Sequence, residues 1–419
     1  MNRPADTCPA TVTDSIEVEA PQTLTTALTL LFAAATGIIV INLFAAQPLT
    51  GPIARSLALP ASLTGAVAML PQLGYAFGLV LLVPLADLVE NRRLIVRTLA
   101  AAAAWLGVAL LTRSGALFLA AIFFAGATSS VIQMLVPMAA SMASESHRGR
   151  AVGNVMSGLM LGILLSRPLA SVVAGSVGWR AFYGIAAAAD VVIAFVLATQ
   201  LPKRTPEVAT QYPQLLGSLW TLLRHERTLQ RRALSAALAM GSFSAFWTAI
   251  GLKLAQAPFG LDFYQIGIFA LAGAAGVVAT PLAGRAGDLG HGRAALTIGH
   301  LSMVVAVIAS GIAGAGWFGF SVTAHRGWAL ALLVASAATL DAGVVTDQTL
   351  GRRAINLMNP AARGRLNGLF VGIFFVGGAL GASLGGLGWA WADWTGVTVV
   401  ALAFAGTALA LGLARGASD

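Results

Sequence analysis

The chain has 419 residues, of which 58% are hydrophobic and only 10% are charged, and its mean hydropathy is +0.83. Because a soluble protein carries about 25% charged residues, this composition excludes an ordinary water-exposed surface and indicates an integral membrane protein. The net charge of +9 would fit a nucleic-acid partner only if the basic residues gathered on one soluble face, and the single cysteine, Cys8, excludes a disulfide framework and a cysteine-based metal site.

Residues 1–24 are rich in acidic side chains and hold only one arginine, whereas a secretory signal needs a basic start followed by an apolar run. We expect a disordered cytoplasmic tail there. Twelve apolar runs long enough for a transmembrane helix follow, at 25–46, 62–86, 95–112, 116–142, 151–175, 179–200, 234–256, 264–284, 294–315, 327–350, 366–390 and 395–414. The sequence therefore predicts an all-α membrane protein with twelve transmembrane helices.

The one long connection, 201–233, divides these helices into an N-terminal six-helix bundle at 25–200 and a C-terminal six-helix bundle at 234–414. Leucines are interspersed with arginines in the second part of the connection. This mixture predicts an amphipathic helix on the anionic cytoplasmic leaflet, because such helices pair an apolar face with basic residues. Residues 415–419 would form a second cytoplasmic tail.

The basic residues indicate the orientation in the membrane. With both termini in the cytoplasm, that side holds 19 of the 25 Lys and Arg residues and the other side holds five, while Arg167 lies inside a span. Cytoplasmic loops carry an excess of Lys and Arg. We therefore expect a multi-pass protein of the bacterial inner membrane with both termini in the cytoplasm.

The two halves of the chain repeat each other at fixed offsets. Asp87 and Asp288, each at the end of an apolar span, are 201 residues apart, and an offset of 215 relates four further pairs and two Arg-Gly-Arg turns: Gln133 and Gln348, Gly153 and Gly368, Gly162 and Gly377, Trp179 and Trp394, and the turns at Arg148 and Arg363. Two parallel six-helix repeats are typical of a transporter architecture whose substrate binds at the interface of the repeats.

These loops also carry a family resemblance. Leu85-Ala86-Asp87 followed by Asn91-Arg92-Arg93, its counterpart Gly284…Asp288…Gly292-Arg293, and the paired Arg-Gly-Arg turns resemble the loop signatures of the major facilitator superfamily. Asn42-Leu43…Gln47-Pro48-Leu49, Gly74-Tyr75-Ala76 and Arg363-Gly364-Arg365-Leu366-Asn367 look most like its bacterial drug and metabolite efflux branch. The first loop departs from the signature, with Val83 and Glu90 in two glycine positions.

The resemblance implies a gate at the cytoplasmic face. In it, Asp87 would contact the start of the eleventh helix, near Arg363 to Asn367, and breaking that contact would favour opening inward. The other loop residues that the resemblance places at this gate are Arg92, Arg93, Arg148, Asp288 and Arg293. The alternative for Asp87 is a solvated loop charge that only marks the topology.

Ionisable residues inside spans are costly unless they are paired, hydrated or neutralised, and four stand out: Arg167, Asp190, Asp341 and Asp347. Asp341 lies near the middle of the tenth span, and Gln348 lies on nearly the same helix face. The resemblance places this helix at the central cavity. Asp341 is therefore a candidate proton carrier, since a carboxylate can be neutral when its site is dry and charged when wet. The alternative is a structural carboxylate paired with a neighbouring helix.

The other charged residues in spans have different expected roles. Arg167 stays protonated, so it needs a carboxylate, carbonyl groups, water or an anionic substrate. It could be the counter-ion of Asp341, a substrate ligand or a structural partner. Asp347 points to another helix face, and we expect it to pair with Arg352 or Arg353 at the inner gate. The sequence indicates no role for Asp190.

Further residues are candidates for the substrate cavity, because an apolar cavity with a few polar anchors suits amphiphilic small molecules. They are Asn42, Gln47, Gln133, Phe246, Trp247 and Gln348, together with Arg167. Glycines at four-residue spacing, such as Gly158 and Gly162, or Gly377 and Gly381, are expected to let helices pack closely rather than to contact substrate.

The sequence thus predicts a secondary transporter that exports a small organic compound in exchange for protons by alternating access. The alternative within transport is uptake or facilitated diffusion of a metabolite, with Arg167 binding an anion. A membrane enzyme is disfavoured, because the five histidines are scattered and no HExxH, P-loop or nucleophile elbow is present. A third class is a sensor that binds ligand without transport. We expect no cofactor or metal, and a monomer.

Overall fold

The computed structural model describes residues 25–144, 147–205, 211–359 and 362–414. The predicted tails, 1–24 and 415–419, lie outside these residues. The described residues form helices and no strand, and eleven of the helices are long and apolar enough to cross a membrane. The last of them has 52 residues and is broken at Ala392 and Asp393, so it is long enough for two crossings. This architecture confirms the predicted all-α membrane fold.

The first half of the chain builds one group of helices. In chain order its elements are α1 Thr26–Phe44, α2 Thr50–Ser56, η1 Ala61–Leu63, α3 Ala66–Leu81, η2 Val83–Asp87, α4 Asn91–Leu111, α5 Gly115–Ser129, α6 Ile132–Met142, α7 Arg148–Val177 and α8 Trp179–Gln200. The predicted fourth span is divided into α5 and α6 by a turn at Ser130 and Val131.

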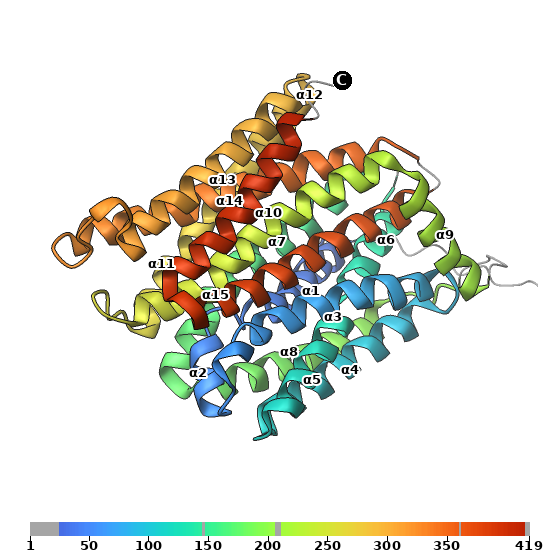
Figure 1. Ribbon diagram of the computed structural model, residues 1–419. Coiled ribbons are helices and arrows are strands. Elements are labelled where there is room, and N and C mark those ends of the chain that lie inside the picture. The colour runs from blue at the N-terminus through green and yellow to red at the C-terminus, as the bar shows by residue number, and fades with distance from the viewer. Residues whose placement is uncertain (1–24, 145–146, 206–210, 360–361, 415–419) are drawn as a thin grey trace, which may run out of the picture.

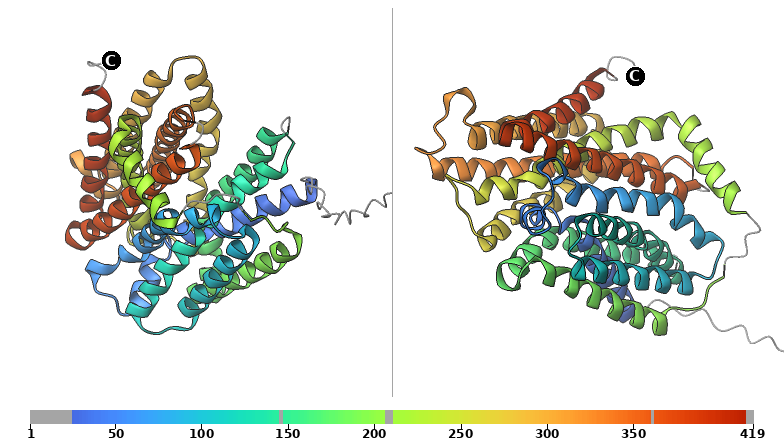
Figure 2. Two further views of the ribbon diagram at one scale, coloured as in Figure 1. Left: turned by 90° about the vertical axis from the view of Figure 1, so that its right-hand side faces the viewer. Right: turned by 60° about the horizontal axis from the view of Figure 1, so that its bottom comes forward.

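The second half repeats this order after the linker helix α9 Tyr212–His225. Its elements are α10 Arg227–Ala255, α11 Phe263–Ala270, η3 Leu271–Ala274, α12 Ala275–Asp288, α13 Gly292–Ala315, η4 Trp317–Gly319, α14 Arg326–Asn356 and α15 Arg363–Ala414. In Figure 1 most helices of the first half, coloured blue to green, lie in the lower part, and the yellow to red helices of the second half lie above them; the views in Figure 2 again separate the two groups.

Glycines bring the same helix pairs together in both halves. A Cβ atom on Gly162 of α7 would lie 2.1 Å from the carbonyl oxygen of Gly37 on α1, and one on Gly377 of α15 would lie 2.1 Å from that of Ala237 on α10. These distances leave no room for any side chain. The 215-residue repeat therefore relates two equivalent backbone contacts, as expected for glycines that let helices approach closely in a membrane.

The linker helix α9 is attached to both halves. The Tyr212 hydroxyl donates to the carbonyl oxygen of Leu81 at 2.8 Å, and Arg365 of α15 donates to the Ser218 hydroxyl at 2.9 Å. Leu215 and Leu219 are buried against the protein, so the apolar face of this predicted amphipathic helix packs on the bundles and not only on lipid. The following helix begins at Arg227 and not at the predicted 234. Its first two turns are charged and lie before the apolar run, so the hydropathy of the sequence did not include them.

The halves meet closely at one end of the molecule. Asp87 follows the last turn of α3, whereas Gly65 precedes its first turn and so lies toward the opposite end of that helix. A Cβ on Gly386 of α15 would lie 2.5 Å from Gly65 Cα, and the Thr50 hydroxyl donates to the Thr248 carbonyl oxygen at 3.1 Å. We call this the glycine end, and the end that carries Asp87 and the Arg148 and Arg363 turns the arginine end.

Candidate functional site

Arg167 of α7 lies buried at the interface of the halves, with 2% of its surface exposed. Its Nε donates to Gln47 Oε1 at 2.7 Å. Three aromatic rings surround the guanidinium, whose Cζ is 4.2 Å from the ring centroid of Trp247, 4.9 Å from that of Phe243 and 5.6 Å from that of Phe44. Gln47 and Phe44 belong to the first half and the other two rings to the second, so Arg167 contacts both halves through cation–π attraction and hydrogen bonding.

Asp341 of α14 approaches the same guanidinium from the second half. It is 4% exposed, and its Oδ1 accepts a hydrogen bond from Trp247 Nε1 at 2.8 Å. A Cβ on Gly273 in η3 would lie 2.7 Å from Asp341 Oδ2 and 3.6 Å from Arg167 Nη1. The missing side chain at Gly273 therefore leaves space for both groups, which lie near each other and attract electrostatically but form no direct hydrogen bond or ion pair among the described residues.

The charge pair has unused hydrogen-bonding capacity. Arg167 Nη2 and Gln47 Nε2 are both buried, and neither has an acceptor among the described residues. A cavity of about 10 Å³, which is room for about one water molecule, lies beside Arg167, Pro48, Trp247 and Phe269. Two buried donors without acceptors are costly, so this site is suited to an acceptor that enters from outside, either water or an oxygen atom of a substrate.

More aromatic and amide groups continue the interface toward the arginine end. The rings of Tyr75 on α3 and Phe375 on α15 have centroids 4.6 Å apart, and Ser244 of α10 donates to Gln72 Oε1 at 3.1 Å. Gln133, a predicted cavity residue, donates to the Tyr75 hydroxyl oxygen at 3.1 Å. Tyr75, Phe375, Gln72 and Ser244 were not predicted as site residues, because contacts between distant helices leave no local signal.

Three predicted cavity residues lie elsewhere or stay unbonded. Asn42 of α1 donates to Asp190 Oδ2 of α8 at 3.3 Å, inside the first half. Phe246 packs against the Trp394 ring at 5.5 Å between centroids, inside the second half. Gln348 is partly exposed and its side chain forms no hydrogen bond within the described segments, so it is not joined to Asp341. The expected Asp341 and Gln348 unit is thus replaced by Asp341 and Trp247, whose indole N–H provides a donor beside the carboxylate.

The predicted pairing of Asp347 with Arg352 or Arg353 is wrong. Asp347 Oδ2 is 2.6 Å from His300 Nε2 and accepts a hydrogen bond from the Ser235 hydroxyl, and all three side chains are buried among α10, α13 and α14. Its position on α14 points the Asp347 side chain into the interior of the second bundle, away from Arg352 and Arg353. His300 Nε2 faces both the carboxylate and the Ser235 hydroxyl, which is 3.3 Å away. His300 Nδ1 has no partner among the described residues, whereas a hydrolase triad uses one ring nitrogen for the serine and the other for the aspartate.

The loop residues at the arginine end form fewer contacts than the gate requires. Arg353 Nε pairs with Asp288 Oδ1 at 3.0 Å, but Asp87 forms no ion pair with any residue that the structure describes. The remaining predicted gate residues bond within the first half or are exposed: Arg92 and Arg93 pair with Glu90, Arg92 also donates to the Leu201 carbonyl oxygen at 3.4 Å, Arg148 donates to the Ala140 carbonyl oxygen, and Arg293 and Arg363 are exposed. Asp87 forms no direct ion pair or hydrogen bond with the start of α15 among the described residues, but the charge of Arg365 in the first turn of that helix attracts it. The predicted gate contact therefore stays a prediction.

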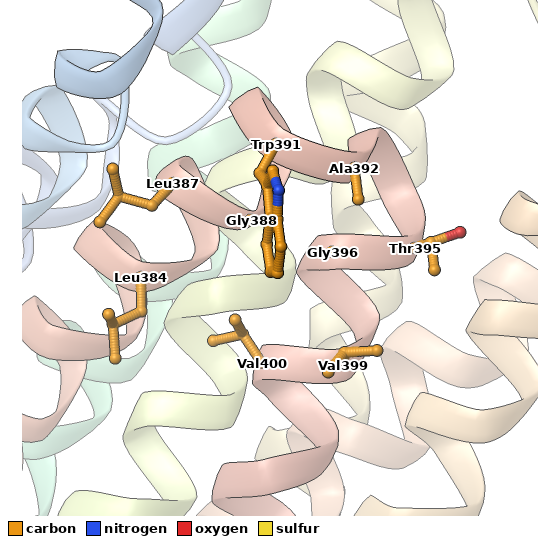
Figure 3. A pocket seen from close by; sticks show the side chains of 9 residues that line it. All are labelled: Leu384, Leu387, Gly388, Trp391, Ala392, Thr395, Gly396, Val399 and Val400. Atoms are coloured by element: carbon orange, nitrogen blue, oxygen red, sulfur yellow. The ribbon is translucent and has the colours of Figure 1, made fainter.

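A larger cavity lies away from this charge pair. It has a volume of about 600 Å³ and lies between the two arms of α15, on either side of the break at Ala392. Figure 3 shows Leu384, Leu387, Val399 and Val400 around the Trp391 ring, which is 90% exposed. Such an apolar surface in a membrane-spanning segment contacts lipid, and it contains no charged group. The candidate functional site therefore remains the Arg167 and Asp341 pair.

Comparison with known proteins identifies relatives along nearly the whole chain. The model of the Major Facilitator Superfamily matches residues 27–355. The chain is 36% identical over 374 residues to the putative uncharacterized transporter YgaY of Escherichia coli (strain K12), covering 89% of this chain and 92% of YgaY. It is 32% identical over 376 residues to the probable transporter SCO4007 of Streptomyces coelicolor, covering 88% and 83% of the two chains.

Solved structures share the fold at low sequence identity. The human organic anion transporter MFSD10 (TETRAN) has a TM-score of 0.60 at 18% identity and covers 92% of this chain and 98% of its own. A peptide transporter POT in complex with sulfate has a TM-score of 0.68 at 16% identity, with 92% of each chain covered. These matches agree with the helices and with the repeat. The chain is a multi-pass membrane transporter, not an enzyme, and belongs to the major facilitator superfamily.

Proposed function

We propose that the protein is a proton-coupled secondary transporter that exports a small organic compound by alternating access, with Asp341 as the proton carrier. The observation that carries this proposal is the buried pair of Asp341 and Arg167, which come from different halves and lie near each other beside Trp247. An ionised carboxylate attracts the guanidinium strongly in a dry interior, and a protonated one does not. Proton binding would therefore weaken one link between the halves.

The surroundings of the pair support a coupling role. Gln47 holds the guanidinium from the first half, and Trp247 holds the carboxylate in the second half. When a proton neutralises Asp341, each charged group keeps its hydrogen-bond partner within its own half. The halves can then separate at this point without leaving an unpaired carboxylate, which is a requirement for alternating access around a central site.

The aromatic groups around the pair suggest the kind of substrate. Phe44, Phe243, Trp247 and Phe269 surround a site that has only a few polar groups. Apolar walls with a few polar anchors suit amphiphilic organic molecules. The resemblance to the drug and metabolite efflux branch supports export as the direction. We place the arginine end in the cytoplasm of a bacterial inner membrane, because this end carries most of the basic residues.

The test uses purified protein in proteoliposomes that contain a pH-sensitive dye. Compounds that the wild-type protein exchanges for protons are identified first, and the assay is repeated with Asp341→Asn. We expect this variant to lose proton-driven movement and to retain exchange of substrate for substrate, since the amide can still accept the Trp247 hydrogen bond but cannot be ionised. Unchanged proton coupling in Asp341→Asn would remove this residue from the mechanism.

Asp262→Asn is the matched control. Asp262 is exposed and caps the start of α11 by accepting a hydrogen bond from the Gln265 backbone N–H at 2.8 Å. Asparagine caps helices about as well as aspartate does, so the change removes the same charge from the same half of the chain at little cost in stability. Proton-driven movement should be unaffected.

The second candidate function is uptake or facilitated diffusion of an anionic metabolite. The specific observation in its favour is the pair of buried, unpaired donors, Arg167 Nη2 and Gln47 Nε2, which could both bond one carboxylate. Two structural neighbours are described as an organic anion transporter and as a peptide transporter in complex with sulfate. Collapsing an imposed pH gradient distinguishes the candidates, because it should abolish uphill export and leave passive anion diffusion unchanged.

A further inference from the structure

Asp190 lies in the first bundle and takes no part in the site proposed above. It belongs to α8 and has no exposed surface. Its only hydrogen bond within the described residues comes from Asn42 Nδ2 of α1, at 3.3 Å to Oδ2. The other carboxyl oxygen, Asp190 Oδ1, is buried without a partner, and so is the amide oxygen Asn42 Oδ1.

Within the part of the chain that the structure describes, no cation pairs with this carboxyl group. Helices α1, α4 and α7 pack against α8. Helix α1 has no charged residue. In α4, the arginine closest to the middle of the helix is Arg97, and it is exposed. In α7, Arg167 is bonded to Gln47 and surrounded by aromatic rings. Asp190 forms no ion pair among the described residues. A buried carboxylate with one long hydrogen bond and no counter-ion is the costly case that proteins avoid by protonation.

We propose that Asp190 and Asn42 form a proton-binding site of the first bundle, separate from Asp341, in which Asp190 is a neutral carboxylic acid. A carboxylate can only accept hydrogen bonds, whereas a protonated carboxyl group can also donate one. A proton on Asp190 supplies the donor that the buried Asn42 Oδ1 lacks. The same side chains would then form two hydrogen bonds, one in each direction, and the buried charge would be removed.

The position of Asn42 connects this proton with the central pair. Asn42 lies in the last turn of α1, and Gln47, which holds Arg167, lies just beyond the end of that helix. Loss of the proton would put an uncompensated charge against α1. The site therefore binds a proton in addition to any proton at Asp341. It fixes α1 against α8 while that proton is bound.

The test is infrared spectroscopy of the membrane-reconstituted protein at neutral pH, in the Asp341→Asn background. A protonated carboxyl group has a carbonyl stretching band that a carboxylate lacks. We expect this band to be present, to shift when all aspartates carry ¹³C, and to be lost completely on adding Asp190→Asn. Because Asp341 is already an amide, the result does not depend on the proposed transport mechanism.

Two further variants make the result specific. Asn42→Leu should keep the band and move it to higher frequency, because the carbonyl group loses a hydrogen bond, and Asp262→Asn should leave it unchanged. The isotope shift shows that the band belongs to an aspartic acid, and the Asn42→Leu shift shows that this acid contacts Asn42, so the two measurements together identify Asp190 even if Asp190→Asn fails to fold. A spectrum with no band that Asp190→Asn removes, or a carboxylate band that changes when Na⁺ replaces K⁺, would overturn the proposal.

Discussion

The two halves of the molecule use the same backbone contacts but different chemistry at equivalent positions. Gly126 on α5 is the repeat partner of Asp341, 215 residues earlier. A Cβ on Gly126 would lie 2.2 Å from the Pro71 carbonyl oxygen, so α3 and α5 are in backbone contact there. In the second half, Asp341 lies over Gly273 instead. In each half a glycine lies at this helix contact, Gly126 in the first half and Gly273 in the second. Only the contact in the second half leaves space for a carboxylate.

This difference shows how a duplicated bundle can hold an asymmetric charge. The first half provides Arg167 and its holder Gln47, and the second provides Asp341 and its holder Trp247. Gln47 and Trp247 are 200 residues apart, which is the offset between Gly37 and Ala237, the residues that Gly162 and Gly377 contact in the two halves. Equivalent positions in the repeat thus hold opposite charges in place. The symmetry of the backbone sets where the groups lie, and the side chains decide which charge each position carries.

The largest expected effect tests the equivalence of the glycine contacts. Gly162→Ala and Gly377→Ala should each destabilise the protein by about 3 kcal/mol or more, because the new methyl group would overlap a backbone carbonyl that cannot move alone. Thermal unfolding of the purified variants in detergent measures this. Gly153→Ala and Gly368→Ala, which are also a repeat pair, are the controls, since no atom lies within 4 Å of the added Cβ. Unequal losses at Gly162 and Gly377 would contradict the equivalence.

The next effect tests the difference at the centre. Gly126→Ala should destabilise the protein nearly as much as Gly162→Ala, by about 3 kcal/mol, because its methyl group overlaps the backbone of Pro71 in the same way. Gly273→Ala should cost less, because its methyl group meets the end of the Asp341 side chain, which can rotate away. That rotation would change the environment of Trp247, so tryptophan fluorescence should change in Gly273→Ala. Equal unfolding temperatures for the two variants would argue against the asymmetry.

A third effect concerns Asp347, the buried acid of the second bundle that contacts His300. Asp347→Asn should cost about 2 kcal/mol, because it alters the buried carboxyl group whose Oδ2 contacts both Ser235 and His300. In the His300→Gln background the same change should cost about 1 kcal/mol less, since residues in contact are not additive. Chemical unfolding of the single and double variants gives the coupling. His291→Gln, at an exposed position, should show none with Asp347→Asn.

The smallest effect compares the two loop aspartates. Asp288→Asn removes an ion pair whose side chains are 74% and 40% exposed, so it should cost less than about 1 kcal/mol and less still at high salt. Asp87→Asn removes no ion pair among the described residues and should change stability by even less. Unfolding measured at low and high salt checks both variants. A salt-sensitive loss in Asp87→Asn would show that this residue has a partner in solution.

The hydropathy of the sequence was enough to predict the spans, because each helix must satisfy its own backbone in the membrane. The glycine contacts were also predictable, since four-residue spacing places Gly158 and Gly162 on one face and small residues on a face bring helices together. The offset between the halves gave the correct equivalence of Gly162 and Gly377. These features depend on local spacing, which a single sequence contains.

The side-chain partners were only partly predictable. Arg167 and Asp341 stood out as charges inside spans, but Trp247 is 94 residues from Asp341 and nothing in its own helix indicates this contact. His300 was treated as one of several scattered histidines, and it bonds to Asp347 only because α13 lies beside α14. A charged residue inside a span indicates that it has a partner. For His300, the feature that indicated a buried partner was its position within an apolar run. Which helix supplies the partner depends on packing.

The crossing of Gly65 with Gly386 affects how the glycine end can come apart. At this crossing the two backbones touch with no side chains between them, so their separation leaves no isolated charge behind, and the nearby side-chain hydrogen bond that it breaks is that from Thr50 to the Thr248 carbonyl oxygen. The resulting contact is closely packed but holds the two halves together only weakly. The shape of the two backbones alone aligns them. In an alternating-access cycle this contact would therefore re-form in the same register on every turnover.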